Sequence, residues 1–278
     1  MIRPPILYAG SPCIVAESPR WCDGESALYW VDVTGGRYYR KQDGGAADEF
    51  ETADPRLGKI GAIVPLGDRR VRLFAEGCRV FECAFGGKPE LVSELPGHGA
   101  RRFNDVLRDG ERFFCGVASE GEALGELWRL AADGSYTCLE AEVKGMPNGM
   151  GVSPNGRTFY FTVSDERRVY AYDYNRATGG LANRRVLISD FPGEGLPDGM
   201  CVDPADGSLF VALWDGSRLE HRSADGGFIE SVNFPMKKVT SVEQTGNRLF
   251  VSTGNKEPDA EGYRRATGAG GVMEVVLS

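Results

Sequence analysis

Short apolar runs alternate with polar turns along the whole chain. Six times, a turn that contains glycine is followed by a run of β-branched and aromatic residues, the types that are enriched in β-strands. The runs are GESALYWVDV, GDRRVRLFAE, GERFFCGVAS, NGRTFYFTVS, DGSLFVALWD and GNRLFVSTGN, and their turn glycines are Gly24, Gly67, Gly110, Gly156, Gly207 and Gly246. The glycines recur every 45 residues or so, roughly the period of one propeller blade.

Each period contains further strand signals. A short apolar stretch such as IGAIVPLG precedes the turn, and a polar-alternating strand such as RRVYAYDYN often follows the run. Asp-Gly and Asn-Gly pairs, which are strong hairpin signals, occur at 109–110, 133–134, 155–156, 206–207 and 225–226. Long stretches of helical period are absent, and no helix is indicated at the Gly-rich ATGAGG of 266–271.

Antiparallel sheets repeated six times at this period predict an all-β fold, a six-bladed β-propeller with about four antiparallel strands per blade. Two sandwiches side by side would not produce a regular period. The N-terminal segment 6–16 and the C-terminal GGVMEVVLS are expected to share a blade. Because no blade is stable alone, we expect residues 1–278 to form a single propeller domain.

Composition narrows the class of function. The formal net charge is −8, and the basic residue pairs are scattered, which argues against a nucleic-acid partner. No apolar run approaches the roughly 18 residues that span a bilayer, and no export signal is evident. The seven cysteines are dispersed and form no C-x-x-C pair, so a reduced, cytoplasmic protein is expected. With only two histidines, a His-rich zinc site is impossible and a Ser-His-Asp triad is disfavoured.

The strand before each turn is expected to be the innermost strand of its blade, so the starts of these strands converge at one mouth of the central channel. Ile60-Gly61 and Thr240-Ser241 occupy two of the six positions. The other four carry a carboxylate or an amide, at Glu17, Asn104, Asn148 and Asp198. Such a group is costly to bury without a cation, and its oxygens suit Ca²⁺, Mg²⁺ or Mn²⁺, with Zn²⁺ tolerated. The alternative is that Asn148-Gly149 and Asp198-Gly199 merely form turns.

Five motifs in this order resemble those of the SMP-30/gluconolactonase family of six-bladed propeller lactonases. They are ESPRW at 17–21, RFND at 102–105, PNGM at 147–150, PDGMCVD at 197–203 and TSV at 240–242. The resemblance implies one divalent metal ion (Ca, Zn, Mg or Mn), held by Glu17, Asn148 and Asp198. It also implies that Arg102 and Asn104 contact a sugar lactone. Glu120 corresponds to an acidic residue that the family often uses, within a segment, GVASEGEALGEL, that departs from the family's commoner form.

The sequence therefore predicts metal-dependent hydrolysis of a sugar lactone to its aldonic acid. Asp198 is expected to act as general base and metal ligand, and Glu17 as a structural ligand. The predicted partner is a small-molecule sugar lactone, with neither nucleic acid nor membrane, and the protein is expected to be a monomer or small homo-oligomer. Alternatives are an esterase or lactonase acting on an aryl ester or a non-sugar lactone, and a non-catalytic propeller that binds Ca²⁺ or other proteins.

Overall fold

Six antiparallel sheets of four strands each make up the fold. The computed structural model describes residues 2–51, 55–118, 121, 124–257 and 259–277. Four consecutive strands form each of five sheets, and the sixth sheet has the order β1-β24-β23-β22. Six such sheets along one chain are a six-bladed β-propeller, so the predicted fold class is confirmed. The N- and C-terminal strands share one sheet, as expected.

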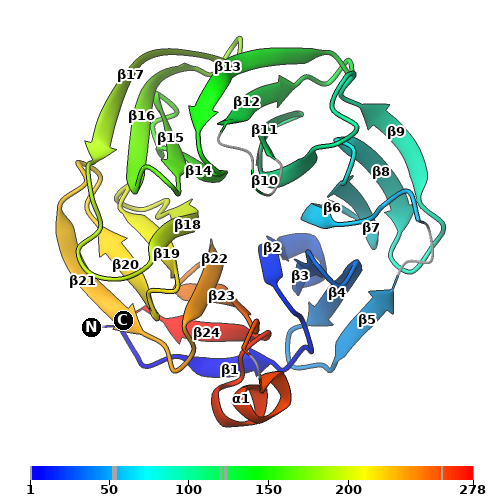
Figure 1. Cartoon of the computed structure of the whole chain (residues 1–278), viewed down its shortest axis with the longest axis vertical. Helices are drawn as coiled ribbons and strands as arrows, with labels where there is room; N and C mark the ends of the chain where they lie inside the picture. The colour runs from blue at the N-terminus through cyan, green and yellow to red at the C-terminus, as the bar shows by residue number, and fades with distance from the viewer. Residues whose placement is uncertain (1, 52–54, 119–120, 122–123, 258, 278) are drawn as a thin grey trace. The chain divides into compact units, whose positions relative to one another are not determined.

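The chain divides into two compact units, residues 1–103 with 243–278 and residues 104–242, which are described separately. The first two sheets belong to the first unit, and Figure 1 labels their strands in order. Their strands are β2 (Ala16–Cys22), β3 (Ala27–Asp32), β4 (Arg37–Gln42), β5 (Ala47–Glu51), β6 (Ile60–Gly67), β7 (Arg70–Ala75), β8 (Arg79–Ala84) and β9 (Glu90–Glu94). The sheet that closes the chain consists of β1 (Ile6–Ala9), β22 (Lys238–Thr245), β23 (Arg248–Gly254) and β24 (Val272–Val276). A 3₁₀ turn, Asp23–Glu25, precedes β3.

The second unit contains the other three sheets. Their strands are β10 (Arg102–Asp109), β11 (Arg112–Ala118), β12 (Leu124–Leu130), β13 (Tyr136–Lys144), β14 (Pro147–Val152), β15 (Thr158–Val163), β16 (Arg168–Asn175), β17 (Gly180–Ile188), β18 (Leu196–Val202), β19 (Leu209–Trp214), β20 (Arg218–Arg222) and β21 (Phe228–Asn233). Strands β10 and β22 cross the boundaries between the two units.

The predicted repeat matches the observed sheets strand by strand. Every apolar run of the pattern forms the second strand of its sheet, as for β3, β11 and β19. All five Asp-Gly and Asn-Gly hairpin glycines adopt a positive φ, which only glycine tolerates readily. Buried aromatic side chains of β11, β15 and β16 then form one core of the second unit, including Phe114, Phe159 and Tyr172.

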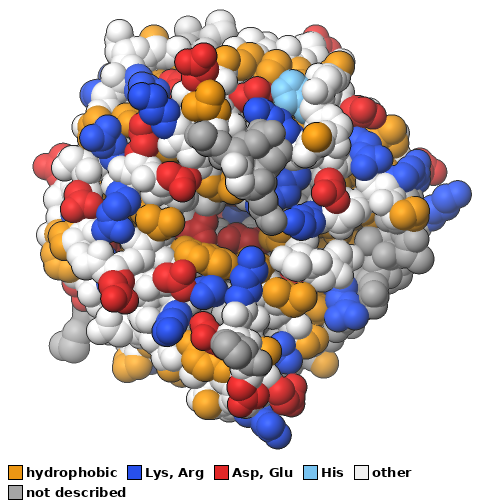
Figure 2. Space-filling model, viewed as in Figure 1, with side chains coloured by type: hydrophobic (Ala, Val, Ile, Leu, Met, Phe, Trp, Pro, Cys, Tyr) orange, Lys and Arg blue, Asp and Glu red, His pale blue; other side chains and the backbone are white. Residues whose placement is uncertain are grey.

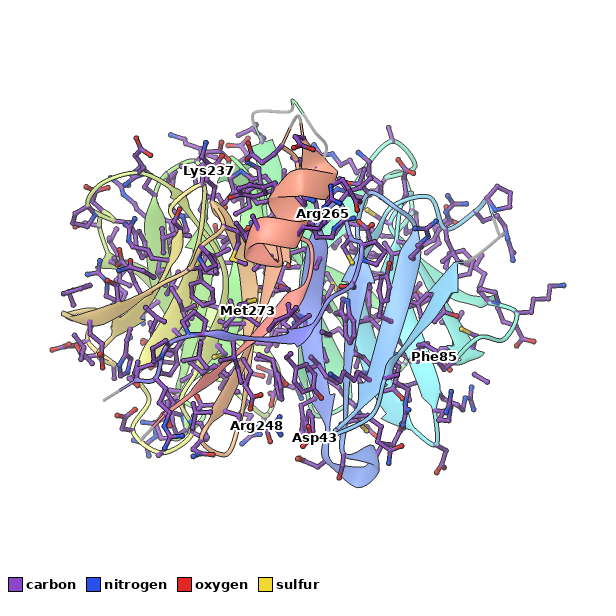
Figure 3. The ribbon with its side chains drawn as sticks, turned by 90° about the horizontal axis from the view of Figure 1, so that it is seen from below. Asp43, Phe85, Lys237, Arg248, Arg265 and Met273 are labelled. Atoms are coloured by element: carbon purple, nitrogen blue, oxygen red, sulfur yellow. The ribbon has the colours of Figure 1, made fainter. Side chains whose placement is uncertain are left out.

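Charged side chains also fix the first unit. Arg248 on β23 donates to both carboxylate oxygens of Asp43 in the β4–β5 turn, at 2.7 and 3.1 Å (Figure 3). The Arg248 guanidinium also lies 4.7 Å from the ring centre of Phe250. The hydrogen bonds from Arg248 hold the pKa of the Asp43 carboxyl below its usual value. On the face drawn in Figure 2, basic side chains are interspersed with acidic and apolar ones.

Two features depart from the sequence predictions or add to them. A single α-helix, α1 (Ala260–Thr267), lies within the described residues, so the expectation of no helix around 266–271 was wrong at its first two positions. Asp259 caps it by accepting from the Gly262 amide, and Gly268 ends it with a φ of 79°. All seven cysteines are described and none is in a disulfide. Across the described ranges, no helix is long and apolar enough to cross a membrane.

Candidate functional site

Each predicted site residue that the structure describes lies at or near the start of the first strand of its sheet. Glu17 is on β2, Arg102 and Asn104 are on β10, Asn148 is on β14, and Asp198 is on β18. Glu120 lies outside the described residues. Glu17 and Arg102 belong to the first unit, whereas Asn104, Asn148 and Asp198 belong to the second. The structure therefore places three of the predicted residues together within one unit.

A β-bulge interrupts the strand at each predicted metal ligand. The pairing register shifts between Glu17 and Arg20 on β2, across 147–150 on β14, and across 197–200 on β18. A bulge turns a side chain out of the regular alternation, and bulges are common beside active sites. A register shift also lies between Ile60 and Ala62 on β6, a first strand without a predicted ligand, so the irregularity is a repeated feature of the first strands.

Asn148-Gly149 and Asp198-Gly199 are not turns, because both pairs lie inside strands. Neither glycine has a positive φ, so its conformation does not require glycine. A Cβ added at Gly149 would lie 2.6 Å from the carbonyl oxygen of Asp198, and one at Gly199 would lie 2.2 Å from Oγ of Ser241. Glycine follows Asn148 and Asp198 because the neighbouring first strand passes too close for a side chain. The alternative that these pairs are simple turn formers is wrong.

Hydrogen bonds connect the candidate residues of the second unit. Nδ2 of Asn104 donates to the carbonyl oxygen of Pro147 at 2.8 Å. Nδ2 of Asn148 donates to Oγ of Ser164 at 3.1 Å, and that hydroxyl donates to the carbonyl oxygen of Pro197 at 2.7 Å. The two acceptor carbonyls belong to Pro147 and Pro197, which immediately precede Asn148 and Asp198 in the chain. Asn148, Ser164 and Asp198 are all buried, with 7%, 7% and 6% of their surface exposed.

Two arginines hold the segment that leads into β18 and Asp198. Arg167 donates to the carbonyl oxygens of Phe191, Gly193 and Gly195, and Arg218 donates to those of Pro192 and Glu194. Nε of Arg167 also donates to the Asp190 carboxylate at 2.9 Å, which lowers the pKa of Asp190. Every carbonyl from 191 to 195 is thus bound by a guanidinium. The approach of the chain to Asp198 is fixed by charge-assisted hydrogen bonds.

Backbone strain accompanies Glu17 in the first unit. Ser18, the next residue, has a φ of 51°, which is unusual for a residue other than glycine. Oε2 of the half-buried Glu17 accepts the Ser18 amide proton at 3.1 Å, and Oγ of Ser18 accepts the amide proton of Ile63 on β6 at 3.2 Å. Ser18 therefore ties the bulge of β2 to the neighbouring strand. Strain held in place by such contacts is a feature of functional sites.

Arg102 is the second predicted site residue of the first unit. The half-buried Arg102 starts β10, where its backbone pairs with Glu76, and its guanidinium donates to the carbonyl oxygen of Phe103 at 3.2 Å.

In the described part of the chain, no group of three or more His, Cys, Asp or Glu residues is placed to hold a metal ion. The predicted ligand set contains only two such residues, since its third member is an amide.

Sequence reasoning missed Ser164, Arg167 and Arg218. Ser164 follows β15 directly and faces the start of β14, so alignment of the sheets by register would have found it. The arginines carry no such signal, because their acceptors are carbonyl groups that any sequence supplies.

Known proteins of one family match most of this chain. The family model described as SMP-30/Gluconolactonase/LRE-like region matches residues 15–255. Pentonolactonase XacC of Haloferax volcanii is 36% identical over 253 residues, covering 89% of this chain and 84% of that protein. L-arabinolactonase of Azospirillum brasilense is 31% identical over 279 residues, covering 96% of this chain and 90% of that protein.

A solved structure supports the fold independently. It is described as a calcium-binding protein, regucalcin, from Agrobacterium tumefaciens, and it superposes on this chain with a TM-score of 0.86. The sequence identity is 20%, and the match covers 99% of this chain and 93% of that one. At this identity the likeness shows the fold alone.

Proposed function

This chain belongs to the SMP-30/gluconolactonase/LRE-like family, and on that premise we propose that it is a carboxylic ester hydrolase that opens a sugar lactone to the aldonic acid. Two of its relatives are named pentonolactonase and L-arabinolactonase. The observation that carries the proposal is a series of hydrogen bonds that begins at the half-buried Asn104 and continues through the buried Asn148 to the peptide bond before Asp198. A propeller that served only as a protein-interaction platform would have no need of such a polar series at its strand starts.

The ligands proposed for a divalent cation are Glu17, Asn148 and Asp198. Two carboxylates and one amide oxygen are hard ligands, which suit Ca²⁺, Mg²⁺ or Mn²⁺ and are accepted by Zn²⁺. The amide nitrogen of Asn148 is occupied by Ser164, so its Oδ1 is the atom left for an ion. Asp198 is also buried, and a cation beside a buried carboxylate lowers the cost of burying its charge. When bound, such a cation supplies Lewis-acid stabilisation to the carbonyl oxygen of an ester under attack.

The chain's own residues supply the remaining chemistry. An Asp198 carboxylate oxygen takes the proton of the attacking water, and general-base help of this kind contributes roughly 10²–10⁴-fold. The Arg102 guanidinium donates a forked pair of hydrogen bonds to substrate oxygens. Asn104, whose amide is anchored to Pro147, orients the hydroxyl groups of the substrate. Glu17 serves as a ligand held by the strained bulge of β2.

A second candidate function is calcium binding without turnover. It is favoured by the proposed ligand set of Glu17, Asn148 and Asp198, whose hard oxygens suit Ca²⁺ whether or not a substrate is turned over. Under both functions we propose that the six sheets form one domain that works as a unit, with a small molecule or an ion as its partner.

The test is lactone opening followed with a pH indicator. Pentono-, hexono- and 6-deoxyhexonolactones are each offered to the protein as purified, after exhaustive chelation, and after restoration of each divalent metal. We expect hydrolysis that chelation abolishes and at least one metal restores. Calcium binding without hydrolysis of any lactone would favour the second candidate, whereas hydrolysis that survives exhaustive chelation would refute the metal's role.

A further inference from the structure

Ser164 determines which way the Asn148 amide faces. A hydroxyl has one proton to donate, and the proton of Ser164 goes to the carbonyl oxygen of Pro197, which can only accept. The same hydroxyl oxygen must therefore act as acceptor toward Asn148. Only the NH₂ group of an amide can donate, so Nδ2 faces Ser164 and Oδ1 faces away from it. The single proton of the Ser164 hydroxyl therefore fixes the orientation of the Asn148 amide.

The same hydroxyl joins both candidate ligands of the second unit. The Pro197 carbonyl belongs to the peptide bond between Pro197 and Asp198, so Ser164 touches the backbone of one ligand and the side chain of the other. All three groups are buried, with Pro197 on β18, Asn148 on β14, and Ser164 directly after β15. Buried polar groups linked in this way hold a geometry tightly, because each broken bond leaves an unsatisfied partner.

The next sheet, which begins with β18, has no serine at the equivalent place, and it carries Asp198 where the sheet before it carries Asn148. Pro147 pairs with Val163 on β15, and Pro197 pairs with Leu213 on β19. By this register Trp214 occupies the place in its sheet that Ser164 occupies in the sheet before. An indole is a donor only, so Trp214 offers no acceptor to an amide at 198. Asn148 donates to the hydroxyl of Ser164, whereas the sheet that carries Asp198 has an indole at the equivalent place.

We propose that Ser164 is a positioning residue that orients Oδ1 of Asn148 for a hard divalent cation and couples Asn148 to Asp198. The part that concerns the cation rests on the proposed function, whereas the orientation of the amide does not. Asp at 148 could not donate, and the single proton of Ser164 would then have two acceptors to serve.

The experiment uses the full chain and three variants. S164A removes the hydroxyl, and N148D removes the donor while adding a negative charge. The matched control is T162V, which removes another buried hydroxyl of β15, one that donates to the sulfur of Met200 at 3.4 Å. The measurements are calorimetric titrations with Ca²⁺ and with Mn²⁺, together with NMR exchange rates of the Asn148 side-chain NH₂ in the metal-free protein.

S164A should bind both cations about 10–100-fold more weakly, the usual cost of losing a residue that orients a ligand, whereas T162V should match the parent. N148D should also bind more weakly, although an added carboxylate alone would raise Ca²⁺ affinity. In S164A the NH₂ protons of Asn148 should exchange faster than in the parent and in T162V. Unchanged cation affinity in S164A, or tighter binding by N148D, would overturn the coupling to the cation.

Failure of the two proposals is distinguishable. If the parent protein binds no divalent cation, the proposed function fails and the exchange measurement alone judges Ser164. Unchanged exchange of the Asn148 protons in S164A would then overturn the orientation as well. Faster exchange would support the orientation whatever the activity of the protein.

Discussion

Substitution of Gly149 by alanine tests the close approach of β14 and β18. The added Cβ would lie 2.6 Å from three atoms, namely the carbonyl oxygen of Asp198 and the backbone nitrogen and Cγ of Met200. Ordinary van der Waals contact begins at about 3.4 Å, so the two strands must separate by about 0.8 Å. Two of the three atoms are backbone, and they cannot move without distorting β18 at Asp198.

The cost follows from this geometry. Inserting a methyl group into a packed interior costs about 1–3 kcal/mol, and we take the upper end because the obstacle is backbone. Replacing glycine returns about 0.4–1 kcal/mol by restricting the unfolded chain. The Gly149→Ala variant should therefore lose about 2 kcal/mol of unfolding free energy, a large share of the 5–15 kcal/mol typical of a domain.

Equilibrium urea denaturation measures this loss against two controls. A Cβ at Gly99 meets nothing within 4 Å, so Gly99→Ala should be neutral or stabilising by up to about 1 kcal/mol. A Cβ at Gly151 meets only a side-chain methyl of Val202 at under 3 Å. Gly151→Ala should fall between the other two, since a side chain can rotate. Lactone hydrolysis should also fall most in Gly149→Ala, and equal stability of Gly149→Ala and Gly99→Ala would refute the reasoning.

Three further predictions concern charged groups. Asp198→Asn should keep the fold and its circular dichroism while lowering kcat by roughly 10²–10⁴-fold in the indicator assay, and near-normal turnover would exclude Asp198 as the base. Arg102→Lys should lower kcat/KM about 10–100-fold through loss of forked hydrogen bonds, without changing cation affinity measured by calorimetry; an unchanged kcat/KM would remove Arg102 from the binding of substrate. The Asp43 carboxyl has a lowered pKa in the folded protein, so its contribution to stability is present above its unfolded pKa of about 4 and is lost as the pH falls below it. Asp43→Asn should therefore show a smaller loss of stability between about pH 5 and pH 3 in urea titrations, and an identical acid dependence would contradict the assigned role of Arg248.

The sequence predicted the sheets well because local rules govern them. Turn glycines must adopt a positive φ and apolar runs must be buried, so both leave a periodic record in the chain. The α1 helix was missed because its eight residues, AEGYRRAT, are few, mostly polar and not buried, so they lack the large apolar side chains of a helix that faces a core. Its Asp259 cap and its final Gly268 were the available signals.

The candidate site was predictable only in part. Equivalent positions in the repeat identify Asn148 and Asp198, because a shared place in successive sheets is visible in sequence. The reasons for Gly149 and for Ser164 are not visible, because each depends on an atom of another strand that packs within a few ångströms. Both were exposed by distances to β18 rather than by any residue preference.

The central claim is that Glu17, Asn148 and Asp198 hold one divalent cation, and a crystal structure of the protein with Mn²⁺ tests it most directly. Anomalous scattering identifies the ion without assumptions about the ligands. The account predicts a single strong peak within about 2.6 Å of a carboxylate oxygen of Glu17, Oδ1 of Asn148 and a carboxylate oxygen of Asp198. A peak bound elsewhere, or Nδ2 of Asn148 turned toward the ion, would contradict it.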